Sequence, residues 1–166
     1  CLFCPYLESD LIFQTVGYDY EHCDKLDEIR SFFELVMPKK EDREFLLRSL
    51  SLGLDGDISE KVFLFIGNGS NGKSQLNALM KNLLGDLAFQ LPPSALLNTS
   101  GNGANPFLAG CHLKRWITCS ECEDGAGMLN CSLLKQISGN RILSARKCFS
   151  NDCETLISGS LAIESN

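Results

Sequence analysis

The stretch Lys61–Gly85, KVFLFIGNGSNGKSQLNALMKNLLG, decides the fold of this chain. It begins with an apolar run rich in Val, Phe and Ile, which predicts a buried strand over Lys61–Ile66. Small polar residues and glycines then interrupt the run. A helical pattern follows over Ser74–Leu84 and ends at Gly85, a usual residue at the C-terminal end of a helix. Strand, glycine-rich loop and helix therefore follow one another directly.

The loop GNGSNGKS fits the pattern G-x-x-x-x-G-K-[ST]. Its glycines allow backbone N–H groups to turn inward around phosphate oxygens, and the following helix presents its positive N-terminal end to the same oxygens. Lys73 is expected to reach the β- and γ-phosphates, and Ser74 to ligate Mg²⁺. An ordinary glycine-rich turn is the other interpretation. The expected nucleotide-binding residues are Gly67, Asn68, Gly69, Ser70, Asn71, Gly72, Lys73 and Ser74.

Such a site also needs an acidic side chain at the end of a neighbouring strand, where it positions Mg²⁺ or the attacking water. The sequence KRWITCS predicts a buried strand, and Glu121, Glu123 and Asp124 follow it. Glu121 is the best candidate because it lies nearest the carboxyl end of that strand, where ligands bind in open sheets. A solvated acidic loop is the alternative. Asn166 closes a further apolar stretch, as either a turn residue or a catalytic one.

The remaining patterns predict helices over Leu26–Met37, through EDREFLLRSLSLGL, and around Leu129–Ile137. LAFQL is a short strand candidate, and strands over 142–149 and 154–163 are expected to be joined by a tight turn at SND. NTSGNGANP is expected to be a flexible loop. Strands that alternate with helices indicate an α/β fold with a mostly parallel sheet covered on both faces. We expect a helical accessory segment over 1–58 and the core over 59–166.

Composition indicates a globular chain of 166 residues, of which 44% are hydrophobic and 22% charged. No apolar run approaches the ~20 residues of a membrane-spanning helix, so no membrane association is expected. The net charge of −6 argues against a general nucleic-acid binder. Residues 1–60 carry 6 basic and 14 acidic side chains, whereas 61–166 carry 9 and 7. A polyanion would therefore prefer the second part.

Nine cysteines are a high and odd number for a chain of this size. The nucleotide-site pattern favours a reducing, intracellular compartment, where thiols remain free. The pair Cys1/Cys4 could form a zinc site with His22 and Cys23, but this spacing and that of the second CxxC pair, at 119 and 122, are not complete zinc-binding sets. Most of the cysteines are expected in the core.

Several stretches together resemble the superfamily-three helicase NTPases, and more narrowly the poxvirus-type and phage/plasmid-type primase–helicases of large DNA viruses and mobile elements. They are FLFIGNGSNGKS, LKRWITCSE, LNCSLLKQISGNRILSAR and LAIESN, with FFELVMPKKEDREFLLRSLSLGL upstream. The resemblance covers about Leu26 to Asn166. It implies an AAA+-like P-loop NTPase core of three layers, preceded by a small helical segment.

The resemblance also implies roles for individual residues. Gly67–Ser74 would be the phosphate loop of an ATPase, Glu121 the Walker B acid that acts with Mg²⁺, and Asn166 the polar sensor of the γ-phosphate or the attacking water. Arg146 and Lys147 fall where these helicases direct basic groups into the ring channel. Contact with single-stranded DNA is expected there, with an ordinary exposed basic pair as the alternative.

Two features depart from the family pattern. The family often has Gly-Asp where this chain has Gly139 and Asn140. In the family, an arginine finger and a last strand of the sheet are expected, and that strand would flank the P-loop strand. Neither appears before Asn166, so an exposed edge is expected beside the P-loop strand. We expect a piece of a longer enzyme that binds ATP but hydrolyses it weakly, because a missing arginine finger costs roughly 10³–10⁵ in rate.

The function implied is ATP-driven unwinding of duplex DNA in viral or mobile-element replication, by a hexameric ring in the host cell. Lys73, Glu121 and Asn166 would be the catalytic residues. A P-loop small-molecule kinase is a second hypothesis, but the chain shows no arginine-rich lid. A non-catalytic nucleotide-binding or oligomerisation module is a third, against which the set of Lys73, Ser74 and Glu121 counts.

Overall fold

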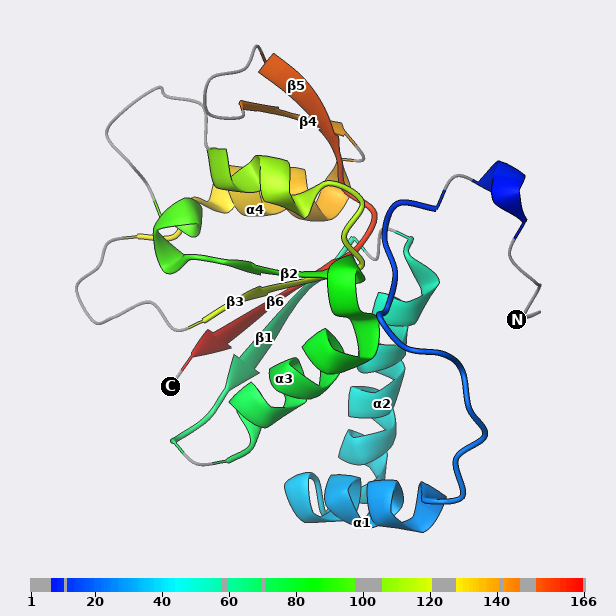
Figure 1. The fold of residues 1–166 in the computed structure, drawn as a ribbon. Helices are drawn as coiled ribbons and strands as arrows, with labels where there is room; N and C mark the ends of the chain where they lie inside the picture. Colours follow the sequence, from blue (N-terminus) through cyan, green and yellow to red (C-terminus); the bar gives the residue numbers. More distant parts are fainter. Residues whose placement is uncertain are drawn as a thin grey trace.

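A parallel sheet of four strands lies at the centre of the fold (Figure 1). The computed structural model describes residues 7–10, 12–57, 60–69, 71–97, 106–120, 128–140, 142–146 and 152–165. Across the sheet the strands are β1 (Val62–Ile66), β6 (Ser160–Ser165), β3 (Trp116–Cys119) and β2 (Ala88–Leu91). All three neighbouring pairs are parallel. The carboxyl ends of these strands therefore meet at one edge of the sheet.

Helices cover one face of the sheet and mixed elements cover the other (Figure 1). The first face packs against α1 (Leu26–Val36), α2 (Lys40–Asp55) and α3 (Lys73–Leu84). On the second lie α4 (Cys131–Gly139) and an antiparallel hairpin of β4 (Ile142–Arg146) and β5 (Asp152–Leu156). Short 3₁₀ helices are η1 (Glu8–Asp10), η2 (Gly85–Leu87), η3 (Pro93–Leu96) and η4 (Pro106–Cys111). The expected α/β architecture with a parallel sheet is confirmed.

The core on the helical face is built around Trp116. This side chain is fully buried and stacks on Phe63, with the ring centroids 5.9 Å apart. Gly53 of α2 lies directly against it: a Cβ there would be 2.8 Å from the Trp116 ring and 2.9 Å from the Met80 methyl. The missing side chain of Gly53 therefore allows α2 to approach the sheet closely.

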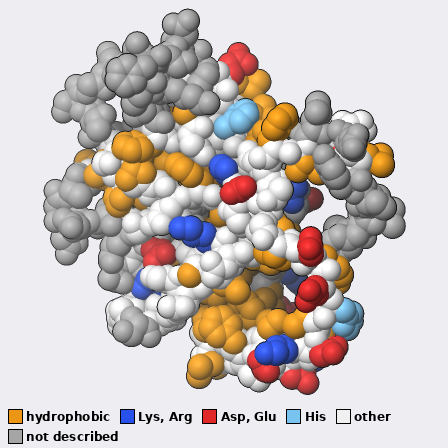
Figure 2. All heavy atoms as spheres, viewed as in Figure 1, with side chains coloured by type: hydrophobic (Ala, Val, Ile, Leu, Met, Phe, Trp, Pro, Cys, Tyr) orange, Lys and Arg blue, Asp and Glu red, His pale blue; other side chains and the backbone are white. Residues whose placement is uncertain are grey.

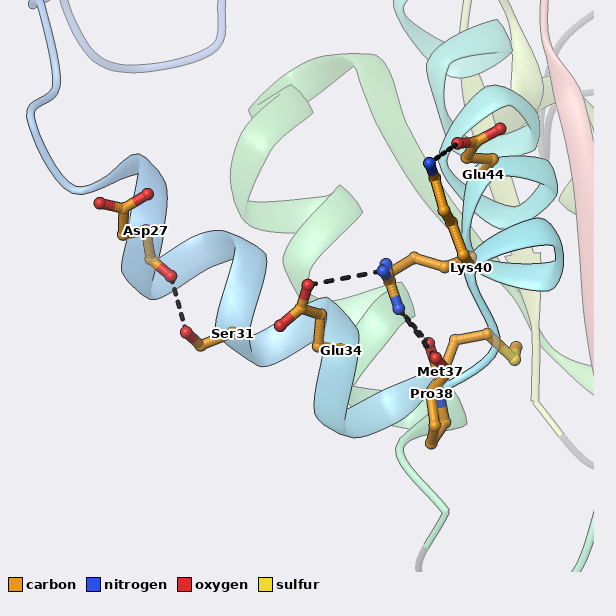
Figure 3. A network of polar contacts seen from close by, with 8 residues as sticks. Asp27, Ser31, Glu34, Met37, Pro38, Lys40 and Glu44 are labelled. Atoms are coloured by element: carbon orange, nitrogen blue, oxygen red, sulfur yellow. Dashed lines mark hydrogen bonds and ion pairs between the residues drawn. The ribbon is translucent and has the colours of Figure 1, made fainter.

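A polar network holds the junction between α1 and α2 (Figure 3). Arg43 donates to the carbonyls of Met37 at 3.0 Å and Pro38 at 3.1 Å, and it pairs with Glu34 at 3.4 Å. These carbonyls follow the last turn of α1, where backbone acceptors have no partner within the helix. The guanidinium therefore links the first turn of α2 to the end of α1 and to the two residues that follow it.

Most element bounds agree with the sequence analysis, and two expectations were wrong. Leu129 was placed in a helix, but it forms an isolated bridge with Leu97, and Asn130 caps α4 by accepting from the Leu133 N–H at 3.0 Å. Residues 154–163 were expected to form one strand, but the chain turns between β5 and β6. At Gly159 a Cβ would lie 2.3 Å from a backbone oxygen, so only glycine fits this turn.

One edge of the sheet is open among the residues that the structure describes. β1 pairs with β6 on one side only, and Leu64 and Ile66 are 56% and 71% exposed. This agrees with the expected open edge beside that strand.

Hydrophobic side chains also gather between α1 and α3 (Figure 2), where Ile29 and Leu79 line a shallow groove. Within the described ranges, no helix has the length and apolar character needed to cross a membrane.

Candidate functional site

The loop after β1 lies at the edge of the sheet where the strands end. Gly67 continues the pairing of the sheet, because its N–H donates to the Ser165 carbonyl at 3.2 Å. Gly72 then adopts a left-handed conformation with φ of 90° and precedes the first turn of α3. The N-cap position of α3 is Gly72, which has no side chain to cap the helix. The chain thus turns sharply from β1 into the N-terminus of α3.

Lys73 is the first residue of α3 and folds back over the loop. Its ammonium group donates to the carbonyls of Gly67 and of Asn68, the latter at 3.2 Å. These contacts hold the positive charge above the loop, next to the N-terminal end of the helix dipole, and both favour an anion at the same place.

Ser74 and Glu164 join the start of α3 to the end of β6. The Ser74 hydroxyl donates to Glu164 Oε2 at 2.7 Å, although 90 residues separate them in the sequence. The second oxygen, Oε1, accepts from the Asn77 side-chain amide at 2.6 Å. Glu164 is half-buried, and its backbone is paired in register with Phe65 of β1. A carboxylate thus lies beside the hydroxyl that the sequence assigned to a metal ion.

Asn77 extends this contact into the core. Its side chain is 7% exposed, and its oxygen accepts from the indole N–H of the fully buried Trp116 at 3.2 Å. Three hydrogen bonds link this row: Trp116 donates to Asn77, Asn77 donates to Glu164, and Ser74 donates to Glu164. We call these four residues the Ser74–Trp116 relay.

The predicted site residues divide between described and undescribed positions. Gly67, Asn68, Gly69, Asn71, Gly72, Lys73 and Ser74 lie together in the loop and at the start of α3. Ser70, Glu121, Asn166 and Lys147 lie outside the described residues, and of Arg146 only the backbone, in β4, is described.

The strand that precedes Glu121 ends at the same edge as the loop. β3 ends at Cys119, which pairs with Ile163 of β6, and β6 lies between β3 and β1. Strands in a sheet are about 4.8 Å apart, so the ends of β1 and β3 are separated by roughly 10 Å.

Glu164 is not among the site residues predicted from the sequence. A signal was present, because β6 reads as an apolar strand and Glu164 is a charged residue on the same face as the buried Ala162. Its partners Ser74 and Asn77 become visible only once β6 is known to lie beside β1.

The described cysteines show no metal site. Cys111 and Cys119 are buried in the core, whereas Cys23 and Cys131 are exposed. Burial raises the pKa of the Cys111 thiol to about 12, although the nearby Lys114 charge lowers it. No group of three metal-binding side chains occurs in the described part of the chain. Cys1, Cys4 and Cys122 lie outside it, so the zinc alternative is untested.

Comparison with solved structures defines the class of fold. The apo structure of the NrS-1 C-terminal region (305–718) superimposes with a TM-score of 0.61 at 15% identity, over 84% of this chain and 33% of that one. A second apo form of the same region gives 0.59 at 14% identity, over 84% and 32%. The chain therefore has the fold found within that region. No family model matches the sequence.

Comparison with curated proteins identifies the relatives. "Primase D5" of fowlpox virus is 29% identical over 92% of this chain, and "Uncoating factor OPG117" of monkeypox virus is 30% identical over 88%. "Putative helicase L207/L206" of Acanthamoeba polyphaga mimivirus is 32% identical over 88%. The chain is thus homologous to a segment of the poxvirus-type primase–helicases, which confirms the resemblance. It spans 21%, 20% and 16% of the lengths of these three relatives.

Proposed function

We propose that the chain is the ATP-binding and ATP-hydrolysing P-loop core of a DNA helicase of the primase–helicase type. The observation that carries this proposal is the loop Gly67–Ser74, which joins β1 to the N-terminus of α3 and places Lys73 above its own carbonyls. The homology to proteins named primase and helicase supports the same assignment.

The loop and helix would hold the phosphates. Lys73 exchanges its bonds to the Gly67 and Asn68 carbonyls for the β- and γ-phosphates, and so neutralises charge where it develops during hydrolysis. Backbone N–H groups at the start of α3, which follows Gly72, supply further donors. The helix fixes these N–H groups before the nucleotide binds, so they need no reorganisation during the reaction.

The oxygen donors beside the loop fit Mg²⁺, which prefers hard oxygen ligands and keeps several waters. The Ser74 hydroxyl, already oriented by Glu164 at 2.7 Å, would be its ligand from the chain. When bound, the ion supplies charge neutralisation at the phosphoryl oxygens. We further propose that Glu121 contributes to the metal site and orients the attacking water, and that Asn166 senses the γ-phosphate.

DNA is the proposed macromolecular substrate, and the homology to primase and helicase proteins supports it. Single-stranded DNA would pass through the channel of a self-associated, hexameric ring and contact Arg146 and Lys147. Energy from hydrolysis would drive unwinding of the duplex during viral replication in the host cell.

A fluorescent-nucleotide titration tests the binding site directly. Lys73→Ala should abolish binding of Mg·ATP, because the charge that faces the phosphates is removed. Lys81→Ala is the matched control: it removes the same charge from the last turn of the same helix and should leave binding unchanged.

Turnover measured with and without single-stranded DNA then tests the helicase assignment. In a longer form that includes the segments flanking this chain, DNA should stimulate hydrolysis, and Lys73→Ala should remove the stimulated rate. Equal binding by the Lys73→Ala and Lys81→Ala variants would refute the site. An ATP hydrolysis rate that is the same with and without single-stranded DNA would instead favour a kinase or another nucleotide-binding role.

A further inference from the structure

We propose that Glu164 is a positioning residue for Mg²⁺: it orients the Ser74 hydroxyl toward the metal and makes nucleotide binding depend on the ion. This inference rests on the proposed binding of Mg·ATP at the loop. Glu164 is supplied by β6, the strand between β1, which leads into the loop, and β3, which precedes Glu121 in the sequence.

The hydrogen-bond directions along the Ser74–Trp116 relay follow from donor chemistry. The indole N–H of Trp116 can only donate, so the Asn77 atom that faces it at 3.2 Å must be the amide oxygen. The Asn77 NH₂ group therefore faces Glu164 and donates to Oε1 at 2.6 Å. Because Trp116 is fully buried, this orientation is fixed from inside the core. Glu164 is held as an acceptor, the role of an ionised carboxylate.

The remaining carboxylate oxygen then sets the rotation of the Ser74 hydroxyl. Oε2 receives the Ser74 proton at 2.7 Å. A hydroxyl has one donor and two acceptor lone pairs, so donation to Glu164 leaves both lone pairs directed elsewhere and available to a cation. Partners that hold a ligand in this way raise its basicity, and their loss typically lowers metal affinity about 10–100-fold.

The charge of Glu164 has opposite effects on the two forms of the nucleotide. Without Mg²⁺, a carboxylate beside the phosphate site repels the polyanion. With Mg²⁺, the same carboxylate stabilises the cation and its ligand. Neutralising Glu164 should therefore weaken Mg·ATP binding while leaving metal-free ATP binding equal or tighter. A merely structural role would weaken both together.

The experiment is a titration of the chain with a fluorescent ATP analogue, once with excess Mg²⁺ and once with EDTA. Glu164→Gln keeps the shape of the side chain and one acceptor oxygen. It should lower the ratio of the ATP affinity measured with Mg²⁺ to the ATP affinity measured with EDTA by about 10-fold or more. Glu154→Gln is the control, because it removes the same charge from an exposed position in the hairpin and should leave the ratio unchanged. In a Ser74→Ala background, Glu164→Gln should lower the ratio less than it does in the wild type, because the part of its effect that acts through the Ser74 hydroxyl is already lost.

The outcomes separate this inference from the proposed function. If the wild-type chain binds neither form of ATP, the proposed function fails and the inference with it. If the wild type binds Mg·ATP but Glu164→Gln leaves the ratio unchanged, or lowers both affinities equally, the inference alone is overturned. Should Glu164→Gln not fold, shown by loss of the buried Trp116 emission, Glu164→Asp replaces it. Asp keeps the charge but is one methylene too short to span Ser74 and Asn77, so Mg·ATP binding should weaken while metal-free ATP binding is unchanged, and the ratio should again fall.

Discussion

At the scale of single residues, the site depends on polar groups embedded in an otherwise apolar interface. Asn77 is 7% exposed and lies between a half-buried carboxylate and a buried indole. A buried donor or acceptor that loses its partner costs about 1–3 kcal/mol, more than the bond itself contributes. The Ser74–Trp116 relay therefore links the stability of the core to the geometry of the loop.

The change Asn77→Leu tests this link. It preserves the approximate size of the side chain but removes the acceptor of the Trp116 N–H and a donor to Glu164, so we expect a loss of about 1–3 kcal/mol in the free energy of unfolding. Urea denaturation followed by Trp116 emission measures it, because this is the chain's single tryptophan. Asn82→Leu on the exposed side of the same helix is the control. Equal midpoints for both variants would refute a stabilising role for the relay.

Single residues also show how far the sequence alone could lead. The strand, glycine-rich turn and helix around Gly67–Ser74 were predictable because the pattern is local and its glycines have a fixed conformational role, whereas phosphate binding by this loop stays a prediction. The role of Glu164 was not predictable, because it depends on a hydrogen bond from Ser74, which is 90 residues away in the sequence. The stretch LAIES does not indicate which strand pairs with it. Glu121 and Asn166 stay predictions, since both lie outside the described residues.

At the scale of elements, the packing of α2 on the sheet depends on Gly53. A methyl group there would meet the rigid, buried Trp116 ring at 2.8 Å, whereas Gly139, at the end of α4, has nothing within 4 Å of the same position. Both glycines lie in helices, where alanine is intrinsically preferred by roughly 0.5–1 kcal/mol. Packing therefore distinguishes two substitutions that are chemically identical.

Gly53→Ala should destabilise the chain despite its better helix propensity, because overpacking a well-filled core costs about 1–3 kcal/mol. Gly139→Ala should be neutral or slightly stabilising. Thermal unfolding of the two variants beside the wild type measures the difference. If Gly53→Ala melts at or above the wild-type temperature, α2 does not pack on Trp116 as described.

Element bounds were largely predictable because hydrophobic periodicity is a local property, as α1 and β1 illustrate. The errors arose where distant contacts decide. Residues 154–163 look like one strand, but Gly159 packs against the Arg115 backbone and the chain changes sheets there. Leu129 has the spacing of a helix face, yet the cap formed by Asn130 starts α4 after it.

At the scale of the whole molecule, the strand order β1-β6-β3-β2 brings three strand ends to one edge. Topology therefore gathers the loop, Glu164 and the position after β3, which come from distant parts of the sequence. A parallel sheet was predictable from the alternation of strands and helices, but the order of its strands was not, because local patterns contain no information on which strands pair. The edge where these ends meet is the place at which open α/β sheets bind ligands.

Nucleotide binding by the loop is tested most directly by a ¹⁵N–¹H correlation spectrum of the chain, recorded during titration with Mg²⁺ and a non-hydrolysable ATP analogue. We expect the largest amide shifts within Gly67–Ser74, smaller shifts at Glu164 and Ser165, and none near Leu26 at the exposed start of α1. Saturating nucleotide that leaves the amides of Gly67–Ser74 unmoved, or that shifts a different surface, would contradict it.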